Sequence, residues 1–350
     1  MSQPNFYEAM SSTKLSPEQQ ILLLKMGFWK SRALAVATEM GLPDILAEKP
    51  LSVDDLASRT AMNASALFRL LRALESIGVF SQPEPRVFAN TPISQCLREG
   101  VPKSQRPVVL SSLSKGNGLF DGWDELGYAM KTGTPSLNKL YGHDFWELCK
   151  REPKVNALFN EMMRSLTHDM TPAITSAYEW DRFSLIADIG GGIGTQLISI
   201  LDAFPCCRGI LFDQPHVLAE ASPHDRIENV EGNFFEHVPK GADAYLLRWI
   251  LHDWAEPEVA TILKVLHQAL KPTASLILAE CVISDGPEFS FGKWLDLQML
   301  VSFGGRERTE SEYQTLLLAS GFELQEVVPT TSPLSLIIAT PKKTLTKRVV

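Results

Sequence analysis

The stretch ADIGGGIGTQL, residues 187–197, decides the fold of this chain. Apolar residues lead up to Asp188, glycines follow at positions 190, 191, 192 and 194, and a helix-forming segment begins after them. Glycine permits a positive φ and close approach to the backbone, and the first turn of a helix has free N–H groups. The pattern therefore predicts a strand, a tight turn and a helix that bind a ligand. A dinucleotide site would use a similar turn.

Strand-length apolar runs alternate with helical segments from about residue 180 onward. The runs are SLIADIG, CRGILFD, IENVEG, ADAYLLRW, ASLILAECV and LSLIIAT. The segments between them include TQLISILDAF, HVLAEA, EVATILKVLHQALK and SEYQTLLLASG. This order predicts an α/β domain, Rossmann-like and doubly wound around a mostly parallel sheet, with ligands at the carboxyl ends of the strands.

Residues 1–100 have a different, mainly helical pattern. Ser16, followed by Pro17 and by Gln19 three residues after the cap, predicts the start of one helix. A second helix is expected after the turn at 52–54, and a third from Asn63 to the stop at Gly78. The stretch SQPEPRVFANTPIS then predicts a short hairpin. Helix, helix and hairpin together indicate a winged helix.

The third helix of this region decides between DNA binding and dimerisation. Its only cations are Arg69 and Arg72, and the rest is rich in Leu, Phe and Ala. Such a surface suits burial against a protein better than contact with phosphates, so dimerisation is favoured. The net charge of −8 likewise argues against a general attraction to nucleic acid.

Composition limits the class of protein further. Of the 350 residues, 45% are hydrophobic and 21% charged, as in an ordinary globular protein. No apolar run reaches the roughly 20 residues that span a bilayer, and MSQPNFYEAM (1–10) lacks the pattern of a signal peptide. A cytoplasmic location with no membrane partner is therefore expected. The five scattered cysteines, without a CxxC spacing, suggest free thiols and no metal site.

Two further strand ends carry residues that suit an adenosine. Asp213 ends the strand in RGILFDQPHV, 23 residues after Gly190, where a carboxylate can accept both hydroxyls of a ribose. Asn233 and Phe234, in GNFF, offer an amide and an aromatic face to an adenine ring. Each residue alone has a structural explanation, but their occurrence at successive strand ends predicts an adenosine-containing ligand.

The fourth strand is followed by RWILHDWAEPE, residues 248–258. His252 there has two interpretations. Taken alone, it begins a helix for which Asp253 is the N-cap. Placed at the carboxyl edge beside the predicted ligand, with Glu280 ending the next strand, it is a candidate general base, because an imidazole accepts protons near neutral pH. Asp253 is then either a cap or a helper.

These motifs together resemble the S-adenosylmethionine-dependent O-methyltransferases of the plant caffeate and bacterial polyketide-tailoring type. The resemblance rests on the glycine turn, FDQPHV, GNFF, RWILHDW, AEC and GGRERTESEYQTLLLASGF. It implies a winged-helix dimerisation domain over 1–100, a helical linker over 101–178 that contributes to the acceptor pocket, and a catalytic domain over 179–350. It also implies a homodimer, a small-molecule acceptor, and S-adenosyl-L-methionine as the cofactor, converted to S-adenosyl-L-homocysteine without a metal.

The resemblance assigns roles by position. Gly190, Asp213, Asn233, Phe234 and Arg248 would bind the cofactor. Arg248 stands where the family often has lysine, and Asn233 where it often has aspartate. His252 would be the general base, oriented and polarised by Glu280 and Glu307. Arg306 and Arg308 offer an alternative for Glu307, an ordinary ion pair.

The acceptor is expected to be a phenolic or enolic hydroxyl of an aromatic or polyketide-like metabolite. Thioether and aromatic walls favour a flat, largely apolar molecule, and the expected lining residues are Phe159, Met163, Met299 and Phe303. The residues leave three alternatives open. These are N- or C-methylation, a cyclase or pericyclase that binds S-adenosylmethionine without transferring its methyl group, and a winged-helix regulator that senses a small molecule.

Overall fold

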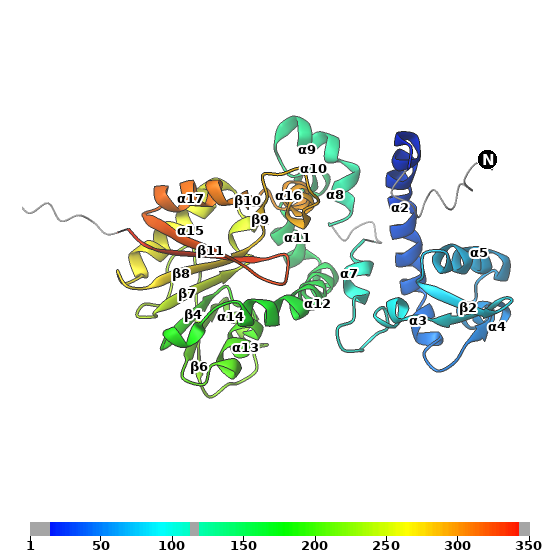
Figure 1. The fold of residues 1–350 in the computed structure, drawn as a ribbon, viewed down its shortest axis with the longest axis horizontal. Coiled ribbons are helices and arrows are strands. Elements are labelled where there is room, and N and C mark those ends of the chain that lie inside the picture. Colours follow the sequence, from blue (N-terminus) through cyan, green and yellow to red (C-terminus); the bar gives the residue numbers. More distant parts are fainter. Residues whose placement is uncertain (1–14, 113–118, 343–350) are drawn as a thin grey trace, which may run out of the picture. The chain divides into compact units, whose positions relative to one another are not determined.

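The structure, a computed structural model, describes residues 15–112 and 119–342, which Figure 1 colours along the sequence. Two compact units make up the chain. One contains residues up to Phe120 together with Pro153–Leu166, and the other contains Asp121–Glu152 and Thr167 onward. Helix α12, Pro153–Ser176, contributes residues to both units. Among the described helices, none has the length and apolar character that a membrane-spanning segment needs.

The first unit combines helices with a small antiparallel sheet. Ser16 caps α2 in a capping box with Gln19, and Asn63 caps α5, as the sequence predicted. Helix α4 is capped by Ser52 and begins at Val53, inside the stretch 52–54 for which a turn was expected. The predicted hairpin is present, and β1 extends it to three strands in the order β1-β3-β2. The elements are α2 (Pro17–Glu39), α3 (Leu42–Ile45), β1 (Leu51–Ser52), α4 (Val53–Thr60), α5 (Ala64–Glu75), β2 (Phe80–Glu84), β3 (Val87–Asn90), α6 (Pro92–Gln95) and α7 (Arg106–Leu110).

The second unit is built on a seven-stranded sheet in the order β11-β12-β8-β7-β4-β5-β6. The five strands from β8 to β6 are parallel, so the prediction of a mostly parallel Rossmann-like sheet is confirmed. The strands are β4 (Leu185–Ile189), β5 (Arg208–Asp213), β6 (Ile227–Glu231), β7 (Ala244–Arg248), β8 (Ser275–Glu280), β11 (Phe322–Pro329) and β12 (Ser335–Pro341).

Helices and short segments surround this sheet (Figure 1). Buried residues of α15 and α17 join those of the central strands in one apolar core. The connecting elements are η1 (Trp180–Arg182), α13 (Thr195–Ala203), α14 (Pro215–Leu218), η2 (Leu251–Asp253), α15 (Glu256–Ala269), β9 (Val282–Ile283), α16 (Phe291–Ser302), β10 (Arg308–Thr309) and α17 (Glu310–Ala319). Four more helices precede α12, namely α8 (Asp121–Asp124), α9 (Leu126–Thr132), α10 (Ser136–Tyr141) and α11 (Phe145–Arg151).

Sequence reasoning missed one strand of the seven-stranded sheet and the short strands β1, β9 and β10, and it lengthened one helix. Strand β11 pairs antiparallel with β12 and carries an irregularity between Leu324 and Glu326, which interrupts the alternation that marks a half-buried strand. The helix expected over HVLAEA is a single short turn, α14. The five cysteines are free, and three of them are buried.

Candidate active site

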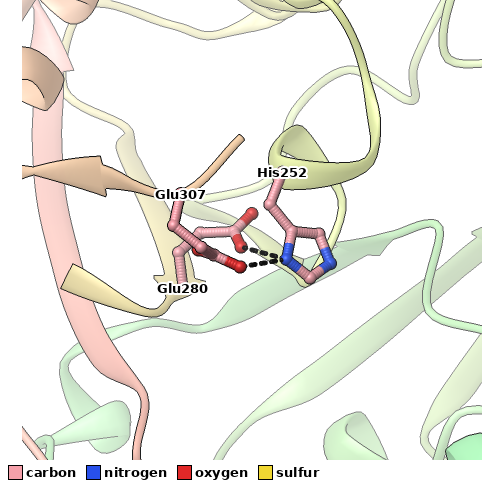
Figure 2. Close-up of side chains that lie close together, drawn as sticks. All are labelled: His252, Glu280 and Glu307. Atoms are coloured by element: carbon pink, nitrogen blue, oxygen red, sulfur yellow. Dashed lines mark hydrogen bonds and ion pairs between the residues drawn. The ribbon is translucent and has the colours of Figure 1, made fainter. Parts of the chain in front are cut away.

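His252 lies in η2, the short turn that follows β7, and its side chain is buried. Its Nδ1 atom is 2.6 Å from Oε1 of Glu307 and 4.0 Å from Oε2 of Glu280. Figure 2 shows both carboxylates directed at this nitrogen from one side of the ring. An imidazole that donates its Nδ1 proton to a carboxylate keeps Nε2 free to accept one.

Glu280 ends β8 and is fully buried. Its Oε1 accepts hydrogen bonds from the backbone N–H groups of Ile250 (3.2 Å) and Leu251 (3.0 Å). Its Oε2 has no hydrogen-bond partner among the described residues. Glu280 therefore holds the turn that carries His252, besides lying near the imidazole itself.

Two contacts position the backbone of Glu307 close to His252. The parallel pairing of β10 with β9 brings the segment before Arg308 beside the end of β8, because Val282 lies opposite Arg308. Asp296 on α16 accepts a hydrogen bond from the Glu307 backbone N–H at 2.9 Å. Asp296 thus fixes the backbone of Glu307.

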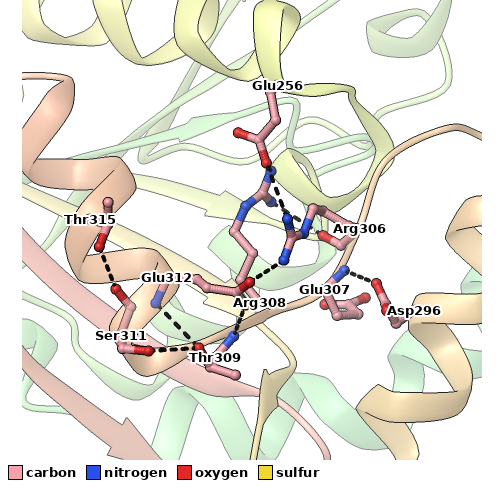
Figure 3. A network of polar contacts seen from close by, with 9 residues as sticks. All are labelled: Glu256, Asp296, Arg306, Glu307, Arg308, Thr309, Ser311, Glu312 and Thr315. Atoms are coloured by element: carbon pink, nitrogen blue, oxygen red, sulfur yellow. Dashed lines mark hydrogen bonds and ion pairs between the residues drawn. The ribbon is translucent and has the colours of Figure 1, made fainter. Parts of the chain in front are cut away.

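The ion pair considered as an alternative for Glu307 is not formed. Figure 3 shows Arg306 directed at Glu312 and Glu256, and Arg308 at Glu256. The Arg308 side chain is buried and its Nη2 lies 2.9 Å from Oε1 of Glu256. The Glu307 carboxylate therefore pairs with His252 and not with either arginine.

Asp253 is not the cap of the following helix, which corrects one of the two interpretations given above. Ala255 occupies the N-cap of α15, and the helix begins at Glu256 with Pro257 in its first turn. Proline favours the first turn of a helix, and its position places the N-cap two residues past Asp253. The Asp253 carboxylate instead lies 3.4 Å from Nε2 of His252.

Burial sets the proton affinity of the three carboxyl groups around His252. Burial raises the pKa of Glu307 to about 8, with Asp296 adding to the rise and Arg308 opposing it. Burial also raises the pKa of Glu280 and of Asp253 to about 7 each, and the charge of His252 opposes both shifts. Such shifted groups around one imidazole mark a candidate site for proton transfer.

Four backbone N–H groups of the glycine turn after β4 already have hydrogen-bond partners within the protein. The N–H groups of Gly190 and Gly191 donate to Phe212 O, and that of Gly194 donates to Gly191 O. The N–H of Gly192 donates to Oδ2 of Asp213 at 2.8 Å. These groups are therefore not available to a pyrophosphate, which argues against the dinucleotide interpretation of the turn.

Two unsatisfied polar atoms lie near this turn. Oδ2 of Asp188 and Nε of Arg248 are buried and have no hydrogen-bond partner among the described residues. The rest of the Arg248 guanidinium is bonded, to Thr171 Oγ1 (2.9 Å), Gln196 Oε1 (3.0 Å) and Thr167 O (3.0 Å). Burial raises the pKa of Asp188 to about 7 and lowers that of Arg248 to about 10. Buried atoms left without partners suit a polar ligand.

The remaining predicted cofactor residues lie at the same edge of the sheet. Gly190 has a φ of +67°, which favours glycine, and a Cβ atom on it would be 2.7 Å from Ile250 Cδ1 and 3.5 Å from Phe234 Cε1. Asn233 is exposed, accepts a hydrogen bond from Phe235 N at 3.0 Å and donates one to Glu236 Oε1 at 3.1 Å. The structure thus places Phe234 beside the glycine turn, while the Asn233 side chain forms hydrogen bonds with Phe235 and Glu236 in the turn that follows β6.

A row of aromatic rings extends from Phe303 to Phe234. Phe303 lies 5.6 Å from Trp146, and Trp146 stacks on Trp254 at 6.0 Å. Trp254 is 4.7 Å from Phe235 and 6.1 Å from Phe234, all measured between ring centroids. Of the four predicted acceptor residues, Phe303 is therefore linked to the predicted adenine residue through rings.

The other predicted acceptor residues lie on two helices. Met299 is buried on α16, four residues before Phe303, which caps that helix. Phe159 and Met163 lie one turn apart on α12, in its first half, which belongs to the first unit.

Comparison with known proteins agrees with this geometry. Residues 123–323 match the model of the O-methyltransferase domain, and residues 22–100 match that of the O-methyltransferase dimerisation domain. A phenazine O-methyltransferase of Lysobacter antibioticus is 39% identical over 91% of this chain and 96% of its own length. The chain belongs to the S-adenosylmethionine-dependent O-methyltransferase family. It is an enzyme of this class, and its cofactor is S-adenosyl-L-methionine.

Other relatives show how the family varies. The crystal structure of LaPhzM has a TM-score of 0.86 and 39% identity, covering 93% of this chain and 100% of that one. An 8-amino-8-demethylriboflavin N,N-dimethyltransferase of Streptomyces davaonensis is 31% identical over 87% of this chain and 89% of its length. Solved structures with this fold include complexes with the cofactor or with S-adenosyl-L-homocysteine.

Sequence reasoning missed two residues of this methyltransferase that contact His252, Gly305 and Trp249. A Cβ atom on Gly305 would lie 1.9 Å from the carbonyl oxygen of His252, so the GGRERT segment touches the backbone of the candidate base. Trp249 has a positive φ of 51° and stacks on the His252 ring. The repeated glycine in GGRERT was a signal for a close backbone approach, whereas Trp249 gave no local signal.

His252, Glu280 and Glu307 of the methyltransferase also satisfy a geometric criterion for metal binding. Each offers one ligand atom, and these atoms lie within 4.8 Å of one another. Nδ1 of His252 and Oε1 of Glu307 are nevertheless at hydrogen-bond distance, 2.6 Å, and so engage each other. The cluster is therefore described as a hydrogen-bonded His252–Glu307 pair with the Glu280 carboxylate beside it.

Proposed function

We propose that this methyltransferase transfers a methyl group to a phenolic or enolic hydroxyl of a small aromatic or polyketide-like molecule, with His252 as the general base. The observation that carries the proposal is the buried hydrogen bond of 2.6 Å between His252 Nδ1 and Glu307. It fixes the ring and the tautomer that leaves Nε2 to accept a proton. A phenol with a pKa near 10 needs this help at neutral pH.

S-adenosylmethionine supplies the electrophilic methyl group. The residues of this chain have three tasks beside it. His252 removes the proton from the attacking oxygen, Glu307 stabilises the imidazolium that results, and Glu280 holds the turn that carries the imidazole. Asp253, 3.4 Å from Nε2, lies beside the nitrogen that would receive the proton.

The cofactor residues proposed are Gly190, Asp213, Asn233, Phe234 and Arg248. The unsatisfied buried atoms of Asp188 and Arg248 support a polar ligand at this edge, and the hydrogen-bonded glycine turn supports one without phosphates. Asp188 would add to the set. Asp213 is partly buried and accepts two backbone hydrogen bonds, from Gly192 and Gln214, which orient its carboxylate for a ribose.

The acceptor wall proposed comprises Phe159, Met163, Met299 and Phe303. The rings that link Phe303 with Trp146 and Trp254 support a flat acceptor, because aromatic faces stack on planar molecules. We add Trp146 and Trp254 to the expected wall for this reason.

A second candidate is N-methylation of an aromatic amine. The flavin N,N-dimethyltransferase among the relatives favours it. A neutral amine needs less help in losing a proton, so the buried His252–Glu307 pair supports the hydroxyl acceptor more strongly.

Isotope-labelled S-adenosylmethionine and matched pairs of acceptors would test this choice. Each pair consists of a hydroxy-arene and the corresponding amino-arene, analysed by mass and by hydrolytic stability of the new bond. Label on oxygen supports the proposal, and label only on nitrogen or carbon contradicts it. A product without label from a consumed acceptor would indicate cyclisation or rearrangement.

We also propose that the enzyme acts as a homodimer through residues 1–100. Helix α2 exposes large apolar side chains, with Leu24 79% and Phe28 58% accessible in the chain analysed alone. Exposed groups of this kind in a row are typical of a protein interface. Light scattering after gel filtration should give twice the chain mass, and Leu24→Glu with Phe28→Glu should give the monomer. A monomeric wild-type enzyme at micromolar concentration would contradict this part.

A further inference from the structure

Trp249 occupies an unusual backbone conformation directly beside the candidate base. It follows β7, and its φ is +51°. Its side chain is only 6% exposed. A bulky residue rarely adopts a positive φ, and such conformations persist where the surrounding structure enforces them and where function needs them.

Strand β8 enforces the conformation from both of its last residues. The Trp249 N–H donates to Ala279 O at 3.1 Å. The next two N–H groups, of Ile250 and Leu251, donate to the Glu280 carboxylate. The backbone is therefore held at the strained residue and at the two residues that follow it.

The indole ring of Trp249 and the imidazole of His252 form an offset stack. The two rings of Trp249 and His252 are 5.7 Å apart between centroids and only 12° from parallel. The π face of an indole attracts a cation within about 6 Å, and tryptophan is the aromatic side chain best suited to this. A parallel ring at this distance favours the charged imidazolium over the neutral imidazole.

The charged neighbours of His252 lie near its two ring nitrogens. Glu307 and Glu280 lie near Nδ1, and Asp253 lies 3.4 Å from Nε2. Asp296 and Arg308 act on the Glu307 carboxyl, and the Cys281 thiol is near Glu280, Glu307 and the indole N–H. The indole therefore supplies an interaction that none of the carboxylates supplies.

We propose that Trp249 is a positioning residue that holds the plane of the His252 imidazole and stabilises the imidazolium formed when the base takes a proton. The effect of Trp249 on turnover rests on the proposed function of His252. The effect of Trp249 on the orientation and charge of the imidazole does not, because the two rings are stacked whatever the role of His252.

Histidine labelled with ¹³C at Cε1 would measure the effect directly in the full-length enzyme. The His252 resonance is assigned with His252→Gln and titrated against pH in wild type, Trp249→Phe and Trp249→Leu. We expect the titration midpoint to fall by roughly half a pH unit to one unit in Trp249→Leu and by less in Trp249→Phe. The His267 resonance is the internal control, because the His267 ring packs edge-on against Phe322 instead of a tryptophan.

Fluorinated tryptophans introduced only at position 249 preserve shape and backbone while weakening the π face. The same titration of His252 can be measured in these fluorinated enzymes if Trp249→Leu does not fold. The His252 midpoint should fall step by step with each added fluorine. A midpoint that stays constant through the fluorinated series would overturn the proposal.

Kinetics separate this proposal from the function of His252. With the stack weakened, the acid limb of the kcat/KM profile should move to lower pH, while S-adenosylmethionine affinity stays constant. A packing role alone would lower stability or raise KM without moving the limb. If His252→Ala retains turnover but the His252 midpoint still shifts in the Trp249 variants, the general-base proposal is contradicted and the proposal for Trp249 is supported. If His252→Ala is inactive and the midpoint stays constant in the Trp249 variants, the proposal for Trp249 is contradicted and the general-base proposal is supported.

Discussion

Nδ1 of His252 lies 2.6 Å from Oε1 of Glu307, and both side chains are buried. The two residues are 55 positions apart in the chain, and η2 and the segment before β10 bring them together. An imidazolium formed at His252 would face this carboxylate without intervening solvent, where a charge pair is stronger than in water.

Replacing Glu307 by Gln should therefore slow catalysis and leave the fold intact. The amide oxygen can still accept the Nδ1 proton, but the negative charge that Glu307 carries above its raised pKa of about 8, and that stabilises the imidazolium, is lost, so the two enzymes are compared above pH 8. We expect kcat to fall about 10- to 100-fold, equivalent to roughly 1.4–2.8 kcal/mol. The matched control is Glu310→Gln, an exposed carboxylate at the start of α17, which should retain wild-type kcat. Equal kcat in Glu307→Gln and wild type would remove Glu307 from the mechanism.

The raised pKa of Glu307 predicts a pH dependence of stability. Burial moves this pKa from 4.5 to about 8, so the folded enzyme binds more protons than the unfolded chain between these values. The contribution of Glu307 to stability is thus largest at low pH and declines as pH rises through this window. Urea unfolding should show a steeper loss of stability between pH 5 and pH 8 in wild type than in Glu307→Gln. Parallel curves would show that burial does not perturb Glu307.

Gly305 should tolerate no side chain. Its Cβ would meet His252 O at 1.9 Å and Asp253 C at 2.6 Å, and both are backbone atoms that cannot rotate away. Gly305→Ala should cost about 1–3 kcal/mol of unfolding free energy and lower kcat by displacing His252. Gly127→Ala on α9 is the matched control, because nothing lies within 4 Å of its added Cβ. Full activity and stability of Gly305→Ala would show that this backbone contact does not position the base.

Arg248 should contribute both to stability and to cofactor binding. Arg248→Met leaves Thr171, Gln196 and the Thr167 carbonyl without their donor, which should cost about 2–4 kcal/mol. Urea unfolding measures this cost, and calorimetry of S-adenosylmethionine binding measures the second effect. Arg208→Met, at the exposed start of β5, should change neither. Unchanged affinity in a folded Arg248→Met enzyme would remove Arg248 from the cofactor site.

The sequence predicted what depends on local pattern. Glycine spacing and apolar runs located β4, α13 and the strands β5, β6, β7, β8 and β12, and capping residues such as Ser16 located helix starts. Asp253 was misassigned as a possible cap because an aspartate before a helix is a good local signal. Pro257, in the first turn of α15, decides where the helix begins.

Tertiary contacts lay beyond such patterns. The approach of Glu307 to His252 depends on the two-residue pairing of β9 with β10, which is too short to leave a periodic signal. The roles of Glu280 and Glu307 were accordingly inferred from family resemblance. The positive φ of Trp249 is imposed by hydrogen bonds from β8, and the aromatic row depends on α11 meeting Phe303.

The central claim is that His252 is the general base, and single-turnover methyl transfer by His252→Ala tests it most directly. Calorimetry first establishes that the variant binds S-adenosylmethionine with an affinity within about threefold of wild type. With a hydroxyl acceptor, the account predicts that the rate of transfer falls by at least about 100-fold. A His252→Ala enzyme that binds the cofactor and transfers the methyl group at the wild-type rate would contradict it.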